Sequence, residues 1–139
     1  MEAELQIEVI IPLRNPTDVL RKTVCSLVEQ TNSDFSVLIS DNFSTQGQEL
    51  ISEGVNQLQG AGIAVRVLRP PAELGRVEHW NWAHHGAAGA WLKPLFAGDW
   101  LEPDYVARPR RAHRLILGMS KHIDLFLGEF GPQPNKQRK

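Results

Sequence analysis

The sequence predicts an α/β fold, a three-layer α/β/α arrangement around a mostly parallel, Rossmann-like sheet. Short apolar segments of strand length alternate along the chain with longer amphipathic segments of helical period. The apolar segments are nearly continuous, as in strands that are buried on both faces of a parallel sheet. The connections between segments are short, which suits consecutive β-α-β units with right-handed crossovers.

The first strand is predicted over residues 7–11, an apolar segment that only Glu8 interrupts. A helix is predicted next, because Asn15 is a suitable N-cap and Pro16 suits the first helical position. We expect this helix to end near Gln30. Its apolar face follows a spacing of three and four residues and comprises Val19, Leu20, Val24, Leu27 and Val28.

The middle of the chain repeats this pattern. A second strand is predicted over 35–39 and a second helix over 46–58, with the glycines of 60–62 at its end. A third strand is predicted over 63–68. Arg69, Pro70 and Pro71 follow it, and proline cannot continue a central strand.

The last predicted elements lead to a single carboxylate on a turn. A third helix is predicted over 76–88 and a fourth strand over 91–96. The Gly98–Asp99 turn follows this strand, and a fourth helix is predicted over 103–116. The order β-α-β-α-β-α-β therefore ends with Asp99 just past the carboxyl end of a strand, where open α/β sheets bind ligands.

The composition fits one soluble domain. The chain has 139 residues, of which 42% are hydrophobic and 22% are charged. We assign residues 1–117 to an α/β domain and residues 118–139 to a divergent C-terminal segment with a basic tail. No Pro-, Gly- or Ser-rich linker separates two domains, and no internal repeat is present.

Charge and cysteine content exclude several classes of protein. The formal net charge of −1 gives no overall attraction to nucleic acid. No apolar run approaches the roughly 18 residues that cross a membrane. Cys25 is the only cysteine, which excludes an intrachain disulfide and fits a reducing, cytoplasmic setting.

Polar residues follow three predicted strands, at 12–15, 40–44 and 97–100. Because parallel strands end at the same edge of a sheet, we expect these loops to form one ligand-binding rim. The hydrogen-bond acceptors and candidate ligands for a hard cation at this rim are Asp41, Asn42, Ser44 and Asp99. Neither GxxxxGK[ST] nor GxGxxG is present, which excludes a P-loop and a dinucleotide-binding fingerprint.

Four segments, taken in order, resemble family 2 glycosyltransferases, which have the GT-A fold and use nucleotide-diphosphate sugars. The segments are IEVIIPLRN, a helix ending in SLVEQT, DFSVLISDNFST, and LGRVEHWNWAHHGAAGAWLKPLFAGDWLEPDY. The resemblance extends from about Ile7 to Tyr105, roughly three quarters of the chain. It implies a GT-A-like nucleotide-binding half.

The resemblance also implies roles for individual residues. The loop after the first strand would embrace the nucleoside, and the pair after the second strand would read the base and ribose. The segment before the fourth strand would lie near the nucleotide. The implied nucleotide-binding residues are Pro12, Leu13, Arg14, Asn15, Asp41, Asn42, Ser44, Arg76, Asn81, Gly98 and Asp99.

The aspartate motif of the family departs from its usual form here. Where D-x-D-D is usual, this chain has Phe96-Ala97-Gly98-Asp99, so only the last aspartate is kept. The resemblance implies that Asp99 binds a divalent metal, Mn or Mg, which takes one or two carboxylates together with phosphate oxygens and water.

The chain after Tyr105 does not resemble the acceptor-binding half of the family, which carries the general base. The remaining carboxylates are Glu102, Asp104, Asp124 and Glu129. We therefore expect a truncated or rearranged glycosyltransferase without its own base, whose acceptor the sequence does not identify. The alternative is an inactive nucleotide-binding or assembly module, and in either case we expect a homodimer with 116–130 in the interface.

Several of these residues also have simpler interpretations. Asp99 could simply initiate a turn and bind no ligand. Asp41 and Asn42 could form an Asx turn. Trp91 and Cys25 are expected in the core. The adjacent His84 and His85, together with His79, are expected on a solvated helix face, and Trp100 is the tryptophan best placed for a ligand contact.

Overall fold

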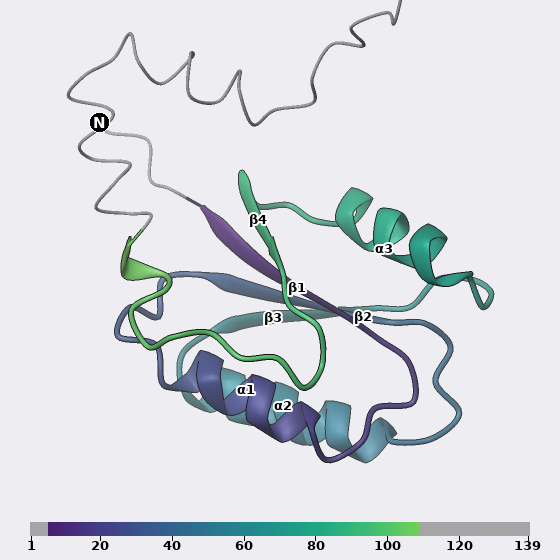
Figure 1. The fold of residues 1–139 in the computed structure, drawn as a ribbon, viewed down its shortest axis with the longest axis horizontal. Coiled ribbons are helices and arrows are strands. Elements are labelled where there is room, and N and C mark those ends of the chain that lie inside the picture. The colour runs from purple at the N-terminus through teal and green to yellow at the C-terminus, as the bar shows by residue number, and fades with distance from the viewer. Residues whose placement is uncertain (1–5, 109–139) are drawn as a thin grey trace, which may run out of the picture. The chain divides into compact units, whose positions relative to one another are not determined.

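The computed structural model describes residues 6–108 (Figure 1). Residues 1–5 and 109–139 lie outside the described range. Of the predicted fourth helix, residues 103–106 form a turn, only Ala107 and Arg108 are helical, and the rest lies outside the described range. The predicted domain boundary at 117, the basic tail and the proposed dimer segment 116–130 also lie outside it.

The described residues form the predicted α/β fold with a four-stranded parallel sheet. The strands are β1 (Ile7–Leu13), β2 (Ser36–Asp41), β3 (Ala64–Leu68) and β4 (Trp91–Pro94). Their order across the sheet is β3-β2-β1-β4, and every neighbouring pair is parallel. From β1 the chain proceeds outward to β2 and β3, and then returns to the other side of β1 to form β4. This reversal places the topological switch point of the sheet between β1 and β4.

Three helices cover the two faces of this sheet. They are α1 (Leu20–Val28), α2 (Gln48–Gly60) and α3 (Arg76–His85). Helices α1 and α2 lie together on one face and α3 lies on the other (Figure 1). The three-layer, Rossmann-like arrangement is therefore confirmed.

The main core lies between the sheet and helices α1 and α2. Alternate residues of β1, Val9 and Ile11, pack there with Leu20 and Leu27 of α1. The α3 face has a much smaller cluster, formed by Ile10, Leu38 and Ala83, so α3 is held by few buried apolar side chains. All seven residues of β1 are buried, as predicted for a central parallel strand.

Glu8 is the one charged residue inside β1, and its side chain is 2% exposed. Its carboxylate accepts hydrogen bonds from Ser36 Oγ (3.1 Å) and from the backbone N–H of Ala88 (2.8 Å). Arg66 lies 3.4 Å away and supplies the opposite charge. The carboxylate is thus paired and hydrogen-bonded, as a buried charge must be.

The predicted N-cap at Asn15 is wrong. Helix α1 begins at Leu20 with Val19 at its cap position, and Asn15 has a left-handed backbone (φ 48°). The Asn15 side chain instead accepts hydrogen bonds from the backbone N–H groups of Thr45 and Gln46 (2.8 and 3.2 Å). It therefore joins the loop after β1 to the loop after β2.

Several predictions of burial are also wrong. Val19 and Val28, predicted on the apolar face of the first helix, are exposed. Trp91 is 36% exposed because β4 is an edge strand, and Cys25 is exposed on the outer face of α1. His79 is only 3% exposed, because its position on α3 faces the sheet.

Pro12 does not end β1, although the first strand is predicted to end before it. β1 continues through Pro12 to Leu13, two residues beyond the predicted end. β4 pairs with β1 only as far as Ile10, so Pro12 lies where β1 has a single neighbour and one N–H fewer is tolerated.

Candidate functional site

A cavity of about 620 Å³ opens at the carboxyl ends of β1, β2 and β4, beside the N-terminus of α3. It lies at the switch point of the sheet, where ligands of open α/β folds bind. Its lining consists of Pro12, Leu13, Arg14, Pro16, Asn42, Glu73, Leu74, Gly75, Arg76, His79, Trp80, Phe96 and Ala97. We call it the rim cavity.

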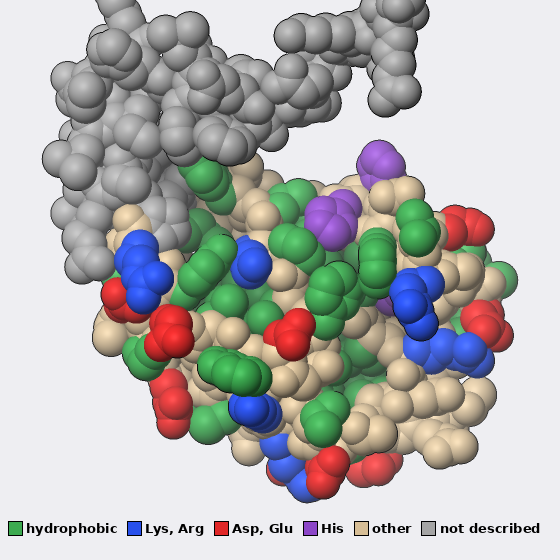
Figure 2. Space-filling view, viewed as in Figure 1, with side chains coloured by type: hydrophobic (Ala, Val, Ile, Leu, Met, Phe, Trp, Pro, Cys, Tyr) green, Lys and Arg blue, Asp and Glu red, His purple; other side chains and the backbone are tan. Residues whose placement is uncertain are grey.

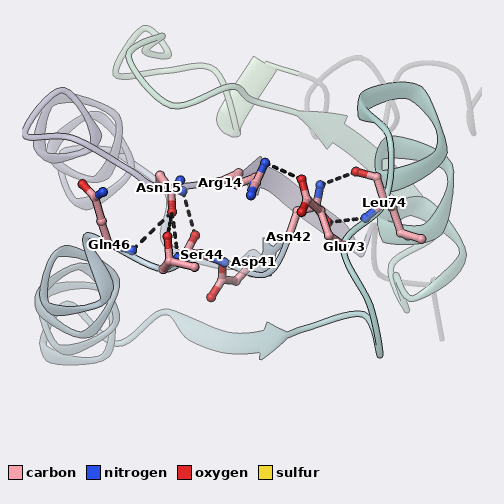
Figure 3. Close-up of polar contacts among 9 residues, drawn as sticks. Arg14, Asn15, Asp41, Asn42, Ser44, Gln46, Glu73 and Leu74 are labelled. Atoms are coloured by element: carbon pink, nitrogen blue, oxygen red, sulfur yellow. Dashed lines mark hydrogen bonds and ion pairs between the residues drawn. The ribbon is translucent and has the colours of Figure 1, made fainter.

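The loop after β1 contributes a charged side chain to the rim cavity. The Arg14 guanidinium forms an ion pair with the Glu73 carboxylate, which belongs to the segment before α3 (Figure 3). Both side chains are about half exposed, at 43% and 52%. This pair is therefore open to solvent, and an anionic ligand could compete with Glu73 for Arg14.

Asp41 at the end of β2 and Ser44 in the loop after it are held by a network of hydrogen bonds behind the cavity (Figure 3). Asp41 Oδ1 accepts a hydrogen bond from the backbone N–H of Ser44 (3.0 Å), and Ser44 Oγ accepts one from the N–H of Asn15 (2.8 Å). Arg69 lies 3.9 Å from Asp41 Oδ2 and stacks over Phe43. Asp41 is 5% exposed and does not line the rim cavity.

Asn42 lines the rim cavity, but its amide already has two partners. Its Nδ2 donates to the carbonyl of Leu74 (2.8 Å), and its Oδ1 accepts from the N–H of Leu74 (2.9 Å). Its own N–H donates to the carbonyl of Leu13 (2.9 Å). Asn42 therefore ties the ends of β1 and β2 to the segment before α3, and Figure 3 shows its contacts with Leu74.

Helix α3 presents a buried histidine and a tryptophan to the rim cavity. A hydrogen bond of 2.8 Å joins His79 Nε2 to Ser40 Oγ, which is itself fully buried. Burial lowers the pKa of His79 below its ordinary value, and the nearby Asp41 carboxylate opposes this shift. Trp80 packs against Phe96 with ring centroids 5.0 Å apart, so an aromatic pair forms one wall.

The turn after β4 carries Gly98 and Asp99. Gly98 has φ +99°, a left-handed backbone that favours glycine, and the Asp99 N–H closes the turn on the carbonyl of Phe96 (2.9 Å). The Asp99 side chain is exposed, and it makes no hydrogen bond or ion pair within residues 6–108. Asp99 lines a second cavity of about 450 Å³ together with Lys93, Phe96 and Trp100.

Phe96 lines both cavities, so the second cavity adjoins the rim cavity. Exposed hydrophobic side chains are frequent on the face seen in Figure 2, and Phe96 and Trp100 are among the exposed large hydrophobic residues. The Lys22 ammonium lies 3.6 Å from the centroid of the Trp100 ring, which fixes this exposed indole against α1.

The structure brings most of the predicted site residues to one rim, in three groups. The rim cavity is lined by Pro12, Leu13, Arg14, Asn42 and Arg76. Asn15, Asp41 and Ser44 form the network behind it, and Gly98 and Asp99 lie on the adjoining turn. Asn81 is exposed on α3 and lines neither cavity.

Sequence reasoning missed Glu73 and the inward position of His79. Position 79 is four residues before Ala83, and both are buried on the inner side of α3, so helical spacing alone could have indicated that His79 faces inward. Glu73 gave no comparable signal, because its partner Arg14 lies far away in sequence.

The carboxylates fit a metal that is shared with a ligand, and they do not fit a cage made by the protein alone. Within the described part of the chain, no group of three or more His, Cys, Asp or Glu residues could hold a metal ion. The exposed Asp99 could supply one carboxylate, which suffices where diphosphate oxygens and water complete the coordination.

Comparison with known proteins gives a family and a fold. The sequence profile of "Glycosyl transferase family 2" matches residues 8–114. Among solved structures, S. aureus TarS has a TM-score of 0.65 at 20% identity, covering 80% of this chain and 19% of that chain. No curated protein shows a significant match.

Two further solved structures hold nucleotide sugars. Residues 1–349 of S. aureus TarS in complex with UDP-GlcNAc give a TM-score of 0.61 at 20% identity, covering 80% of this chain and 31% of that chain. The mannosyltransferase PcManGT from Pyrobaculum calidifontis, in complex with GDP-Man and Mn²⁺, gives 0.61 at 21% identity, covering 73% and 30%. The chain thus spans about a fifth to a third of the length of these neighbours.

Proposed function

The chain belongs to glycosyl transferase family 2, and we propose that its rim cavity binds the nucleotide diphosphate of a sugar donor. The observation that carries this proposal is the convergence of three strand-end loops and the α3 N-terminus on one cavity at the switch point of the sheet. The cavity volume, about 620 Å³, is within the usual range for small-molecule sites.

The cavity lining has two arginines and one carboxylate, Glu73, and this excess of positive charge suits an anionic ligand. Arg14 and Arg76 both line it, and both side chains are exposed. The aromatic wall of Trp80 and Phe96 offers apolar surface to a nucleoside or sugar ring. We assign Arg14 and Arg76 to the diphosphate, with Pro12 and Leu13 beside the nucleoside.

Asp99 is the residue that would hold a divalent metal, manganese or magnesium. Such an ion, when bound, would stabilise negative charge on the leaving diphosphate as a Lewis acid. The exposed Asp99 carboxylate would contribute one ligand, and Gly98 would give the turn the shape that presents it. The TarS and PcManGT complexes with nucleotide sugars support this proposal at the level of the fold.

Transfer of the sugar to an acceptor hydroxyl requires a general base that we do not assign. Glu102 and Asp104 are the described carboxylates that follow the turn, and Asp124 and Glu129 lie outside the described residues. The chain spans only part of its structural neighbours, so the complete reaction and the homodimer are proposals, and the acceptor is not assigned.

Among the helices of residues 6–108, none has the length and apolar character of a membrane span.

Calorimetric titration with uridine and guanosine diphosphates, with and without Mn²⁺, tests the proposal. We expect binding of at least one nucleotide, strengthened by Mn²⁺ in the wild type and not in Asp99→Asn. Absence of binding by either nucleotide under both conditions would refute the donor site. Nucleotide binding that Mn²⁺ strengthens equally in Asp99→Asn would refute only the role of Asp99. Light scattering separately tests the homodimer.

A further inference from the structure

Three polar side chains interrupt the inner face of α1 and the turn that follows it. They are Thr23, Ser26 and Gln30, at spacings of three and four residues, and they are 0%, 9% and 8% exposed. Buried polar groups need hydrogen-bond partners. All three find partners in the backbone of residues 98–106, about 75 residues further along the chain.

Thr23 makes two of these contacts with one hydroxyl group. Its Oγ1 accepts a hydrogen bond from the N–H of Gly98 (2.8 Å) and donates one to the carbonyl of Asp99 (2.7 Å). The Asp99 N–H already donates to the carbonyl of Phe96. Hydrogen bonds therefore hold the N–H and the carbonyl of Asp99 and the N–H of Gly98, while the Asp99 carboxylate is exposed.

Ser26 and Gln30 continue the same row of contacts. The Leu101 N–H donates to Ser26 Oγ (3.2 Å). The Gln30 side chain donates from Nε2 to the carbonyl of Glu102 (2.6 Å) and accepts at Oε1 from the N–H of Val106 (3.0 Å). The segment after the turn is thus attached to α1 at several points beyond Asp99.

We infer that Thr23 is a positioning residue for Asp99, and that its hydroxyl directs the Asp99 carboxylate toward the metal that accompanies the donor diphosphate. This inference rests on the proposed function. Fixing the backbone on both sides of a residue fixes the direction of its Cα–Cβ bond, so the lone carboxylate is limited to the positions that its side-chain rotamers reach from that bond. The order gained in this way lowers the entropy cost of binding.

Thr23→Val is the direct test, because it keeps the shape of the side chain and removes the hydroxyl. We expect the affinity for uridine or guanosine diphosphate without Mn²⁺ to stay within about twofold of the wild type. The factor by which Mn²⁺ raises the nucleotide affinity should fall by about 10- to 100-fold, as when a group that orients a metal ligand is lost. Thr23→Ser keeps the hydroxyl and should retain the effect of Mn²⁺.

Thr17→Val is the matched control, because Thr17 is exposed before α1 and the substitution is chemically the same. It should leave both affinities unchanged. A purely structural role for Thr23 would lower stability without changing the response to Mn²⁺. Wild-type Mn²⁺ dependence in folded Thr23→Val would therefore overturn the inference.

Amide hydrogen exchange gives a second readout that requires no ligand. In the wild type, we expect protected amides at Gly98 and Asp99. Thr23→Val, or the smaller Thr23→Ala if the valine variant does not fold, should expose Gly98 selectively and leave Val106 protected. Rapid exchange of Gly98 in the wild type would overturn the inference. Failure of the wild type to bind any nucleotide would instead refute the proposed function, and the exchange data would still test the hydrogen bonds.

Discussion

The loop after β2 and the turn after β4 each place an aspartate at the same rim, but the two carboxylates have opposite environments. Asp41 is 5% exposed, accepts a hydrogen bond from the Ser44 N–H and lies near Arg69. Asp99 is exposed, and its carboxylate has no protein partner among residues 6–108. Their roles therefore differ: Asp41 shapes the rim, and Asp99 is available to a ligand.

The two regions are also held in different ways. Around β2, side chains such as Asn42 bind the backbone of neighbouring loops, and the polar groups of the predicted site are largely satisfied by the protein. Around β4, the backbone is bound by α1 and the site side chain is left outward. A polar residue at the end of a strand is thus a better ligand candidate where it is exposed than where a buried hydrogen-bond network already satisfies it.

The substitution expected to have the largest effect is Asn42→Asp. It removes the donor to the Leu74 carbonyl and places a charged oxygen there, which should lower the free energy of unfolding by about 2–3 kcal/mol. Because the folded chain disfavours the charged form, the pKa of the introduced carboxyl rises, and the deficit should shrink as the pH falls toward about 4. Urea unfolding measures both effects.

The control for this substitution is Asn56→Asp, at an exposed position of α2, which should be close to neutral. If Asn42→Asp lowered the free energy of unfolding as little as Asn56→Asp, the Asn42 amide would not be held by the protein as the structure indicates. Such a result would mean that the Asn42 amide is free to face a ligand.

Gly98→Asp adds a second acid to the motif but should not strengthen metal binding. The backbone there has φ +99°, so a side chain costs about 1–2 kcal/mol, although a Cβ would make only ordinary contacts with Val19. We expect lower stability in urea unfolding and no gain in Mn²⁺ affinity with the nucleotide present. Gly62→Asp, at φ +79° with open space around it, is the control for backbone strain. Tighter Mn²⁺ binding by Gly98→Asp would show that the turn adapts.

Arg14→Gln should change binding more than stability. The Arg14–Glu73 pair is exposed, so its loss should alter the free energy of unfolding by less than about 1 kcal/mol. The affinity for a nucleoside diphosphate should fall by about tenfold, and the loss should be larger at low salt. Glu73→Gln, which removes the competing carboxylate, should bind at least as well as the wild type. Weaker binding by both variants would show that the ion pair itself shapes the cavity.

His79 should give the smallest effect, a contribution to the pH dependence of stability. Its pKa is lowered in the folded chain by burial, so the unfolded chain binds more protons below about pH 6.5. Stability attributable to His79 is therefore present above that pH and is lost as the pH falls toward the folded pKa. Unfolding free energies between pH 8 and 5 should decline less in His79→Gln than in the wild type. Equal slopes would contradict the burial of a neutral His79.

The fold could be predicted because it depends on patterns that are local in sequence. Continuous apolar runs such as that of β1 identify buried parallel strands, and glycines and prolines mark the connections. The errors came from tertiary contacts. Asn15 was a reasonable N-cap by local rules, but Thr45 and Gln46 compete for its side chain from another loop.

The site could be predicted at the level of the rim and not at the level of contacts. The positions of Arg14, Asn42 and Asp99 after strands placed them at one edge of the sheet. Their partners, such as Leu74 for Asn42, lie about 30 residues away and leave no periodic signal in the sequence. Sequence reasoning also missed Thr23, Ser26 and Gln30, which stand at helical spacing but whose partners lie about 75 residues further along the chain.

Broadening of amide resonances by Mn²⁺ in the presence of a nucleoside diphosphate tests most directly whether Asp99 and the rim cavity form the donor site. We expect selective loss of signal at Gly98, Asp99, Leu13 and Gly75, with sharp signals retained at the C-terminal end of α2, at Leu58 and Gly60. The same experiment on Asp99→Asn should show little broadening at the rim. Broadening centred away from the rim, or unchanged in Asp99→Asn, would contradict the claim that this carboxylate and the rim cavity form the donor site.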